Sequence, residues 1–261
     1  MTRRMFIAEI GRSTLAVAVL GGLAACAVET DGSSTSSGEP DLGSSTAGTV
    51  PTSTTAGQTT TSAGTAGVDW HRVNLGFVSA YLLSRNGEVA VVDTGVSGSA
   101  SAIELGLSGI DLGWDAVSHV ILTHRHNDHV GSLTDVLGLA SSAEGFCGEG
   151  DIDAINSPRA LTAVGDGDAV FGLDVIETPG HTPGHIAVLD PVAGLLLAGD
   201  ALNGSGGGVA GPNPRFSPDM VSANQSVEKL ARLTFEIVLF GHGEPVLSGA
   251  SQAVAELAAT L

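Results

Sequence analysis

The chain has 261 residues and is strongly acidic, with 28 Asp and Glu against 10 Lys and Arg and a net charge of −18. A surface with this charge repels phosphate backbones, so we expect no nucleic-acid partner. Aromatic residues make up only 4% of the chain, which predicts a core of aliphatic side chains.

Residues 1–26 have the pattern of an export signal. Arg3 and Arg4 supply the positive start, and an uncharged apolar run follows them. The arginine pair resembles a twin-arginine signal, and the Leu-Ala-Ala-Cys run ending at Cys26 resembles a bacterial lipobox. A transmembrane helix is the alternative, but the apolar run is shorter than the roughly 20 residues that a span needs. We therefore expect an exported protein held at the cell membrane by a lipid on Cys26, with secretion as the alternative.

Residues 27–67 consist mainly of Ser, Thr, Gly and Ala. Such a segment buries too little apolar surface to offset the entropy lost on ordering, which predicts a disordered linker. Residues 68–261 remain for one folded domain. Its only cysteine, Cys147, has no partner for an internal disulfide, and we expect it to be a buried apolar side chain.

The hydrophobic pattern of this domain predicts both strands and helices. Short β-branched runs predict strands at 73–75, 78–83, 88–93, 120–123, 173–177, 185–189, 195–198 and 235–240. Helices are predicted at 97–107, 131–139, 220–233 and 248–261, and Asn156–Arg159 has the Ser and Pro of a helix start. Because strands also occur in runs, two packed sheets with helices outside fit better than one doubly wound sheet.

The densest group of metal-ligand side chains is the His-Arg-His-Asn-Asp-His run at 124–129, directly after a predicted strand. Three imidazoles and one carboxylate in six residues suit two zinc ions better than one. Three more candidates, His181, Asp200 and His242, each follow a predicted strand and lie beside a glycine, which lets the backbone approach closely. Ligands commonly bind at the carboxyl ends of strands, so we expect these residues to form one site.

The H-x-H-x-D-H run at 124–129, the later His181, Gly199-Asp200 and the Gly-His-Gly at 241–243 resemble the motifs of the metallo-β-lactamase-fold superfamily of hydrolases. The Val-Val-Asp-Thr-Gly run that contains Asp93 resembles the first motif of the same superfamily. The resemblance covers essentially all of residues 68–261. It implies an α/β fold, the αβ/βα four-layer sandwich, in which two mixed β-sheets carry helices on their outer faces and a metal site along one edge.

The resemblance also implies a dinuclear site, with two zinc ions and with iron or manganese as alternatives. One metal would be held by His124, His126 and His181, the second by Asp128, His129 and His242, with Asp200 bridging both. Water activated between the ions would attack an ester, thioester or lactone carbonyl of a small molecule, and Asp128 would carry a proton to the leaving group. Asp93 would support the metal loop from behind.

Other residues near these motifs receive weaker predictions. The Gly-rich stretch from Asn203 to Gly211 lacks a phosphate-loop motif, and we expect a flexible rim of the active site. Asn203, Arg215 and Phe216 are candidates for substrate contacts there. We expect His185 to be a structural, hydrogen-bonded residue rather than a metal ligand.

The choice among subfamilies stays open. Asp200 disfavours a true β-lactamase, whose members have Cys or Ser at the bridging position. Glyoxalase II-like thioesterases share the ligands but carry a basic, glutathione-binding helical region that we do not find after His242. Lactonases share them too, but have a Tyr soon after the bridge, where this chain has Ala201–Asn203. A mono-iron oxidoreductase similar to persulfide dioxygenases and a non-catalytic, surface-tethered metal-binding lipoprotein are the remaining alternatives.

Overall fold

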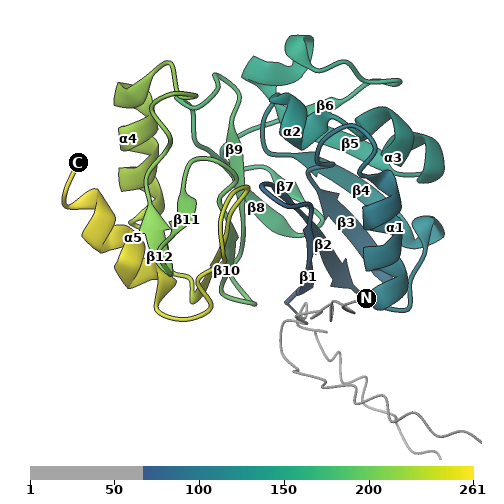
Figure 1. Cartoon of the computed structure of the whole chain (residues 1–261), viewed down its shortest axis with the longest axis horizontal. Coiled ribbons are helices and arrows are strands. Elements are labelled where there is room, and N and C mark those ends of the chain that lie inside the picture. The colour runs from purple at the N-terminus through teal and green to yellow at the C-terminus, as the bar shows by residue number, and fades with distance from the viewer. Residues whose placement is uncertain (1–66) are drawn as a thin grey trace, which may run out of the picture. The chain divides into compact units, whose positions relative to one another are not determined.

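Two mixed β-sheets face each other in the computed structural model, which describes residues 67–261 (Figure 1). The first sheet has the order β1-β2-β3-β4-β5-β6. Its strands are β1 (Asp69–Asn74), β2 (Ser79–Arg85), β3 (Glu88–Val92), β4 (Val117–Leu122), β5 (Glu144–Gly148) and β6 (Thr162–Val164). Strands β1 to β3 pair antiparallel, and β3 to β6 pair parallel.

The second sheet has the order β13-β10-β9-β8-β7, antiparallel except for the β10–β13 pair. Its strands are β7 (Ala169–Val170), β8 (Leu173–Glu177), β9 (Ile186–Asp190), β10 (Leu195–Leu197) and β13 (Ile237–Leu239). A separate hairpin is formed by β11 (Asn203–Ser205) and β12 (Gly208–Ala210). The predicted flexible rim at 203–211 therefore contains a short hairpin.

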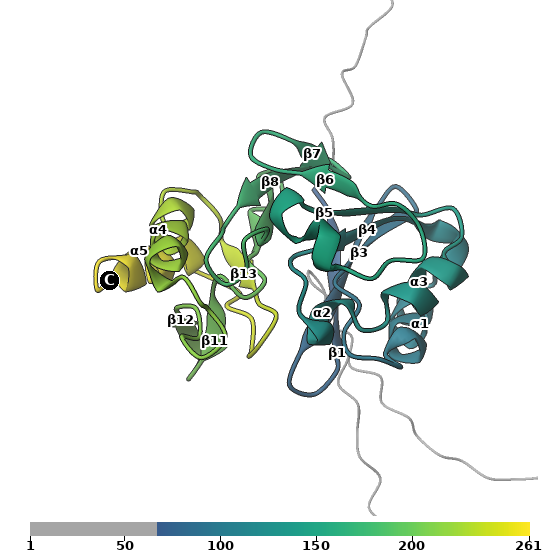
Figure 2. The ribbon, with the colours of Figure 1, turned by 90° about the horizontal axis from the view of Figure 1, so that it is seen from above.

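Helices cover the outer face of each sheet, as the two views together show (Figures 1 and 2). The helices are α1 (Ala100–Gly109), α2 (Asn127–Val130), α3 (Leu133–Leu139), α4 (Met220–Leu230) and α5 (Ala250–Ala258), with short 3₁₀ helices η1 (Trp114–Ala116) and η2 (Glu149–Ala154). Helices α1 and α3 lie on the first sheet, while α4 and α5 lie on the second. The helix predicted at 131–139 corresponds to α3, and the short helix α2, which was not predicted, precedes it within the ligand run.

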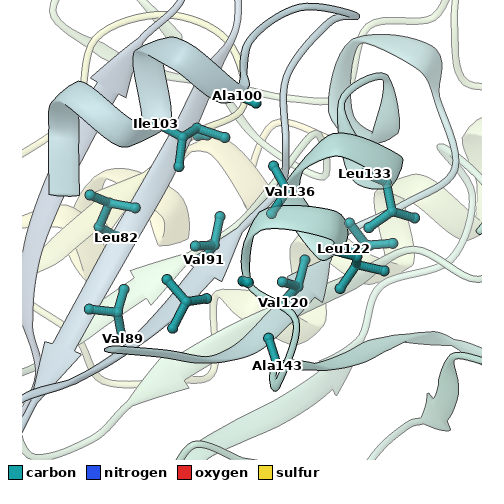
Figure 3. Packing of buried hydrophobic residues seen from close by; sticks show 14 of the residues in the cluster. Leu82, Val89, Val91, Ala100, Ile103, Val120, Leu122, Leu133, Val136 and Ala143 are labelled. Carbon is teal, nitrogen blue, oxygen red and sulfur yellow. The ribbon is translucent and has the colours of Figure 1, made fainter. Parts of the chain in front are cut away.

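Alternation along the strands explains why both faces of each sheet are buried. In β4, Val120 and Leu122 pack with α1 and α3 (Figure 3), whereas Ile121 points into the layer between the sheets. In β9, Val188 joins the same central layer and Leu189 joins the α4 and α5 side. Three aliphatic layers thus separate four layers of secondary structure, which confirms the predicted sandwich. Cys147 lies fully buried in this core, and burial raises the pKa of its thiol to about 12.

The prediction of a helix start at Asn156–Arg159 is wrong, because the structure has no helix between η2 and β6. Ser157 uses its hydroxyl to donate to the carbonyl of Arg159 at 2.7 Å. The guanidinium of Arg159 in turn donates to the carbonyls of Ala140 and Ala143 at 2.9 and 2.7 Å, just beyond the end of α3. The polar groups that suggested a helix start therefore stabilise a turn and the end of an earlier helix.

Residues 1–66, which include the predicted signal, Cys26 and nearly all of the predicted linker, lie outside the described residues. Within the described part, no helix combines the length and apolar character needed to cross a membrane.

Asp190 links the two sheets at the end of β9, and its side chain is completely buried. The carboxylate accepts hydrogen bonds from the amides of Val68 and Ala193, and from Arg85 at 2.8 Å. Burial alone would raise the pKa of Asp190, but these bonds outweigh it and lower the pKa. The stability that they provide is therefore lost as the pH falls below the ordinary aspartate value of about 4.

We predict that Asp190→Ala lowers the free energy of unfolding by about 3–5 kcal/mol, because it leaves a buried arginine unpaired. Urea unfolding at pH 7 measures the loss, and repeating it near pH 3 should show a smaller difference from wild type. Asp166→Ala is the control, since the Asp166–Lys229 pair is exposed and should contribute about 1 kcal/mol or less. Equal losses in the two variants would contradict the prediction.

Candidate metal centre

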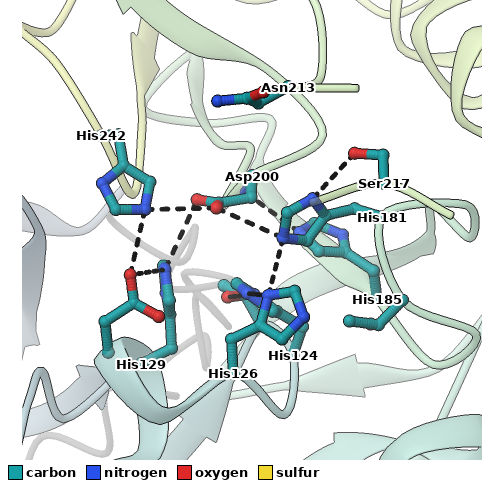
Figure 4. A network of polar contacts seen from close by, with 12 residues as sticks. His124, His126, His129, His181, His185, Asp200, Asn213, Ser217 and His242 are labelled. Carbon is teal, nitrogen blue, oxygen red and sulfur yellow. Dashed lines mark hydrogen bonds and ion pairs between the residues drawn. The ribbon is translucent and has the colours of Figure 1, made fainter. Parts of the chain in front are cut away.

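The predicted ligands meet where strands of both sheets end (Figure 4). The first sheet supplies its group after β4, on the following loop and on α2: His124, His126, Asp128 and His129. The second sheet supplies one residue after each of β8, β10 and β13: His181, Asp200 and His242. These seven side chains form overlapping groups whose ligand atoms lie within 4.8 Å of one another.

Three imidazoles converge on one side of the site. Nδ1 of His126 lies 3.0 Å from Nε2 of His124 and 2.9 Å from Nε2 of His181. Burial lowers the pKa of His181 to about 4 and holds that of His124 well below its ordinary value. Both rings are therefore neutral at pH 7, the protonation state that a metal requires of an imidazole.

Carboxylates dominate the other side. Oδ2 of Asp128 lies 3.3 Å from Nε2 of His242 and 3.9 Å from Nε2 of His129. Hydrogen bonds to Asp128 and then to Asp200 raise the pKa of His242 to about 10. These acidic groups thus favour a positive charge at this point, and a divalent cation would compete with the proton of His242.

Asp200 lies between the two groups. Its Oδ2 is 3.3 Å from Nε2 of both His181 and His242, and its Oδ1 is 3.5 Å from Nε2 of His129. Burial alone would raise the pKa of Asp200, but the neighbouring imidazoles, His242 first, hold it far below its usual range. A Cβ at Gly241 would collide with Oδ1 of Asp200 and the ring of His129, so this approach requires a glycine.

Two buried atoms at the centre of the site indicate whether a metal ion fits there. Nε2 of His129 and Oδ1 of Asp200 are buried and have no hydrogen-bond partner among the described residues. A buried polar atom left in this way costs about 1–3 kcal/mol, which a folded protein rarely tolerates without a reason. Imidazole nitrogen and carboxylate oxygen are both zinc ligands, so the donor set fits one or two such ions.

Contacts behind the imidazoles fix their orientation. In four of the five ligand imidazoles the second nitrogen meets a polar group: Thr123 for His124, Asp93 for His129, Ser217 for His181 and the carbonyl of Phe77 for His242, at 2.6–3.0 Å. Such partners select the tautomer and aim the other nitrogen, here into the site.

Asp93 is placed where the sequence motif suggested, behind the first ligand loop. Its carboxylate accepts from the amide and the hydroxyl of Thr123, both at 2.8 Å, and contacts Nδ1 of His129 at 2.7 Å. The residue has a left-handed backbone with φ of 59°, an uncommon conformation for a residue other than glycine. Asp93 therefore connects the end of β3 to two ligand-bearing segments.

His185 has both ring nitrogens engaged with protein groups. Nδ1 lies 2.7 Å from the hydroxyl of Thr178, and Nε2 accepts from the amide of Asp200 at 3.0 Å. Burial lowers the pKa of His185 to about 3, which keeps this acceptor nitrogen neutral. The ring thus holds the backbone of Asp200 in place.

A cavity of about 570 Å³ opens above the cluster. Its lining comprises Phe77, His126, Asn127, Asp128, His181, Asp200, Asn203, Asn213, Phe216 and His242. Of the three predicted rim residues, Asn203 and Phe216 line the cavity. Arg215 is not part of the lining, and its exposed guanidinium lies over the ring of Phe216 at 5.9 Å.

Sequence reasoning missed Phe77, Asn127 and Asn213 in this lining. Phe77 lies in the β1–β2 turn, far from every motif, and its ring stacks on His242 with centroids 6.0 Å apart. Nothing in a Gly-Phe turn indicates such a contact. Only Asn127 could have been predicted to lie near the site, because it stands between the proposed ligands His126 and Asp128 in the sequence.

Comparisons with known proteins agree on one family. Residues 73–242 match the sequence profile of the Metallo-beta-lactamase superfamily. The chain is 30% identical over 198 residues to the uncharacterised protein YobT of Bacillus subtilis, covering 64% of this chain and 83% of YobT. It is 31% identical over 172 residues to a hydroxyacylglutathione hydrolase of Aeromonas hydrophila. That match covers 64% of this chain, and the chain spans only 61% of that relative's length.

Solved structures give the same result. A metallo-beta-lactamase family protein from Thermus thermophilus has a TM-score of 0.58 and 28% identity, covering 70% of this chain and 74% of that one. A beta-lactamase from Chitinophaga pinensis shares the fold, with a TM-score of 0.57 at 17% identity and coverage of 75% and 88%. The profile match spans the whole cluster from His124 to His242, and the chain belongs to the metallo-beta-lactamase superfamily.

Proposed function

We propose that the protein is a dinuclear metallo-hydrolase that cleaves an ester, thioester or lactone bond in a small molecule. The observation that carries this proposal is the pair of buried ligand atoms, Nε2 of His129 and Oδ1 of Asp200, that make no hydrogen bond at the centre of the cluster. The two atoms lie 3.5 Å apart, and with His124 they form a group whose ligand atoms lie within 4.8 Å of one another. Such a group of imidazole and carboxylate ligands suits a cation.

The seven residues divide naturally between two ions, for which we propose zinc. One ion would be held by His124, His126 and His181, the other by Asp128, His129 and His242, and Asp200 would contact both. When bound, such ions would supply Lewis-acid activation of a water nucleophile and of the substrate carbonyl. Asp128 lines the cavity with its side chain 28% exposed, so it can pass a proton to the leaving group.

The cavity lining supports a neutral substrate with an apolar acyl group. Phe77 and Phe216 line the cavity although they are 65% and 58% exposed, and together they offer apolar surface beside the metal site. The polar lining consists of amides, imidazoles and carboxylates, and none of the described residues that line the cavity is Lys or Arg. An anionic substrate such as a glutathione thioester would therefore meet no Lys or Arg side chain in this lining.

The export route is a separate proposal that rests on residues 1–26 alone. A lipid on Cys26 would hold the hydrolase at the outer side of the cell membrane. Labelling cells with a fatty-acid analogue, with Cys26→Ser as the control, tests that anchor.

The full chain should bind two equivalents of zinc, and Asp200→Ala should bind at most one tightly, because the shared ligand is lost. Elemental analysis after dialysis measures both, and Asp135→Ala, an exposed aspartate on α3, should keep two equivalents. One iron and no zinc in the wild type would contradict this proposal and favour the mono-iron oxidoreductase.

Zinc-loaded protein should hydrolyse neutral esters or lactones in a panel that also contains thioesters, β-lactams and phosphodiesters. Asp200→Ala should lower kcat/KM by more than the roughly 10–100-fold that loss of an outer hydrogen-bond partner costs at a metal site. Asp135→Ala should retain activity. Full hydrolysis by Asp200→Ala, or by chelator-treated wild type, would refute the mechanism.

The aromatic lining predicts a difference in KM. Phe77→Ala and Phe216→Ala should each raise KM for a long apolar acyl ester by about 10-fold, and should change KM for the acetyl ester much less. Leu105→Ala removes a side chain that is 75% exposed on α1, and serves as the control for general loss of apolar surface. Equal effects on long and short acyl groups would show that these rings do not contact the acyl chain.

A further inference from the structure

Asp151 is a buried carboxylate close to the metal centre that belongs neither to the seven proposed ligands nor to the cavity lining. It lies in η2, directly after β5, and its side chain is 0% exposed. A carboxylate with no access to water needs several hydrogen-bond donors to keep its charge. Asp151 has four such donors, and they come from two segments of the chain.

Each oxygen of Asp151 joins the two segments. Oδ2 accepts from the amide of Arg125 at 3.0 Å and from the hydroxyl of Thr182 at 2.5 Å. Oδ1 accepts from the guanidinium of Arg125 at 3.4 Å and from the amide of Gly184 at 3.0 Å. The carboxylate therefore binds the β4–α2 loop and the β8–β9 loop symmetrically, with two donors from each.

These are the two loops that carry the imidazole trio. Arg125 stands between His124 and His126, and Thr182 follows His181. The geometry of the trio therefore depends on the distance between these two loops. His126 and His181 are 55 residues apart in the sequence, and their loops follow strands of different sheets. A metal tolerates little error in that distance, because zinc–nitrogen bonds are close to about 2.0–2.1 Å.

Tight backbone packing brings Asp151 to this position. A Cβ at Gly184 would collide with the amide of Asp151, and one at Gly150 would lie 2.9 Å from the amide of Gly184. The η2 segment and the β8–β9 loop thus lie in direct backbone contact. The close approach leaves little freedom for the carboxylate to move away from its four donors.

We propose that Asp151 is a positioning residue that sets the spacing of the two loops and thereby the affinity for the ion held by His124, His126 and His181. The proposal rests on the metal site of the proposed function. It assigns Asp151 to one ion of the pair, because three of its four donor groups belong to Arg125 and Thr182, which adjoin the imidazole trio. The fourth comes from Gly184 in the loop that carries His181, and none comes from Asp128, His129 or His242. Loss of Asp151 should therefore lower the binding affinity for one ion more than for the other.

The test is competition for Zn²⁺ between the full chain and a chromophoric chelator, which resolves two binding constants. Asp151→Asn should weaken one constant by about 10–100-fold, the usual effect of losing an outer partner of a metal ligand, and leave the other nearly unchanged. The visible spectrum of the Co²⁺-loaded variant should change in the same way, with the bands of one ion altered.

Asp190→Asn is the matched control. Asp190 is also a fully buried aspartate that accepts from backbone amides and from an arginine, but its contacts are remote from the ligand loops. We expect both variants to unfold at lower temperature and only Asp151→Asn to lose zinc affinity. Equal zinc affinity in Asp151→Asn and wild type, or an equal loss in Asp190→Asn, would overturn the inference.

Thr182→Val decides the matter if Asp151→Asn does not fold. It removes a single donor from one loop and keeps the shape of the buried side chain, so the same binding constant should weaken by several-fold. An unchanged constant would overturn the inference. A wild-type chain that binds no Zn²⁺ would instead overturn the proposed function itself, so the two failures are distinguishable.

Discussion

The negative charge of Asp200 needs neighbouring positive charge or hydrogen-bond donors, because its carboxylate is nearly buried. Its side chain is 9% exposed and stands among three imidazoles that approach from both sheets. A carboxylate loses much solvation energy on burial, so it stays ionised only where positive charge or donors surround it. The metal ions proposed for this site would supply that charge. His129, His181 and His242 all lie within 3.5 Å of this one carboxylate.

The sandwich supports this arrangement because two sheets end at the same edge. Each sheet is buried on both faces by close-packed aliphatic side chains. This packing fixes the strand ends from which the ligand loops start. The first sheet contributes a continuous run of ligands and the second contributes single residues. Carboxylates then connect the parts: Asp93 supports the β4 loop from β3, and Asp151 joins that loop to the β8–β9 loop.

Local patterns predicted eight strands and the position of the ligands after strand ends, because both depend on residues close in the sequence, and the family motifs implied the four layers. The patterns did not predict β5, β6, β7 or the β11–β12 hairpin. They failed at Asn156–Arg159, where Ser157 and Arg159 serve a turn and the end of α3. They also missed Phe77, and they gave no reason to notice Asp151. The importance of both residues lies in contacts with distant segments, which periodicity and capping rules cannot detect.

The turn at Phe77 performs two tasks through different parts of one residue. Its carbonyl accepts from Nδ1 of His242, while its ring stacks on His242 and lines the cavity. The side chain can therefore be substituted, changing the cavity lining, while the peptide oxygen still accepts from the imidazole. Lengthening or shortening the turn would displace both at once. The cavity lining at this turn can thus change by point substitution at Phe77, whereas an insertion beside it would also move the group that orients His242.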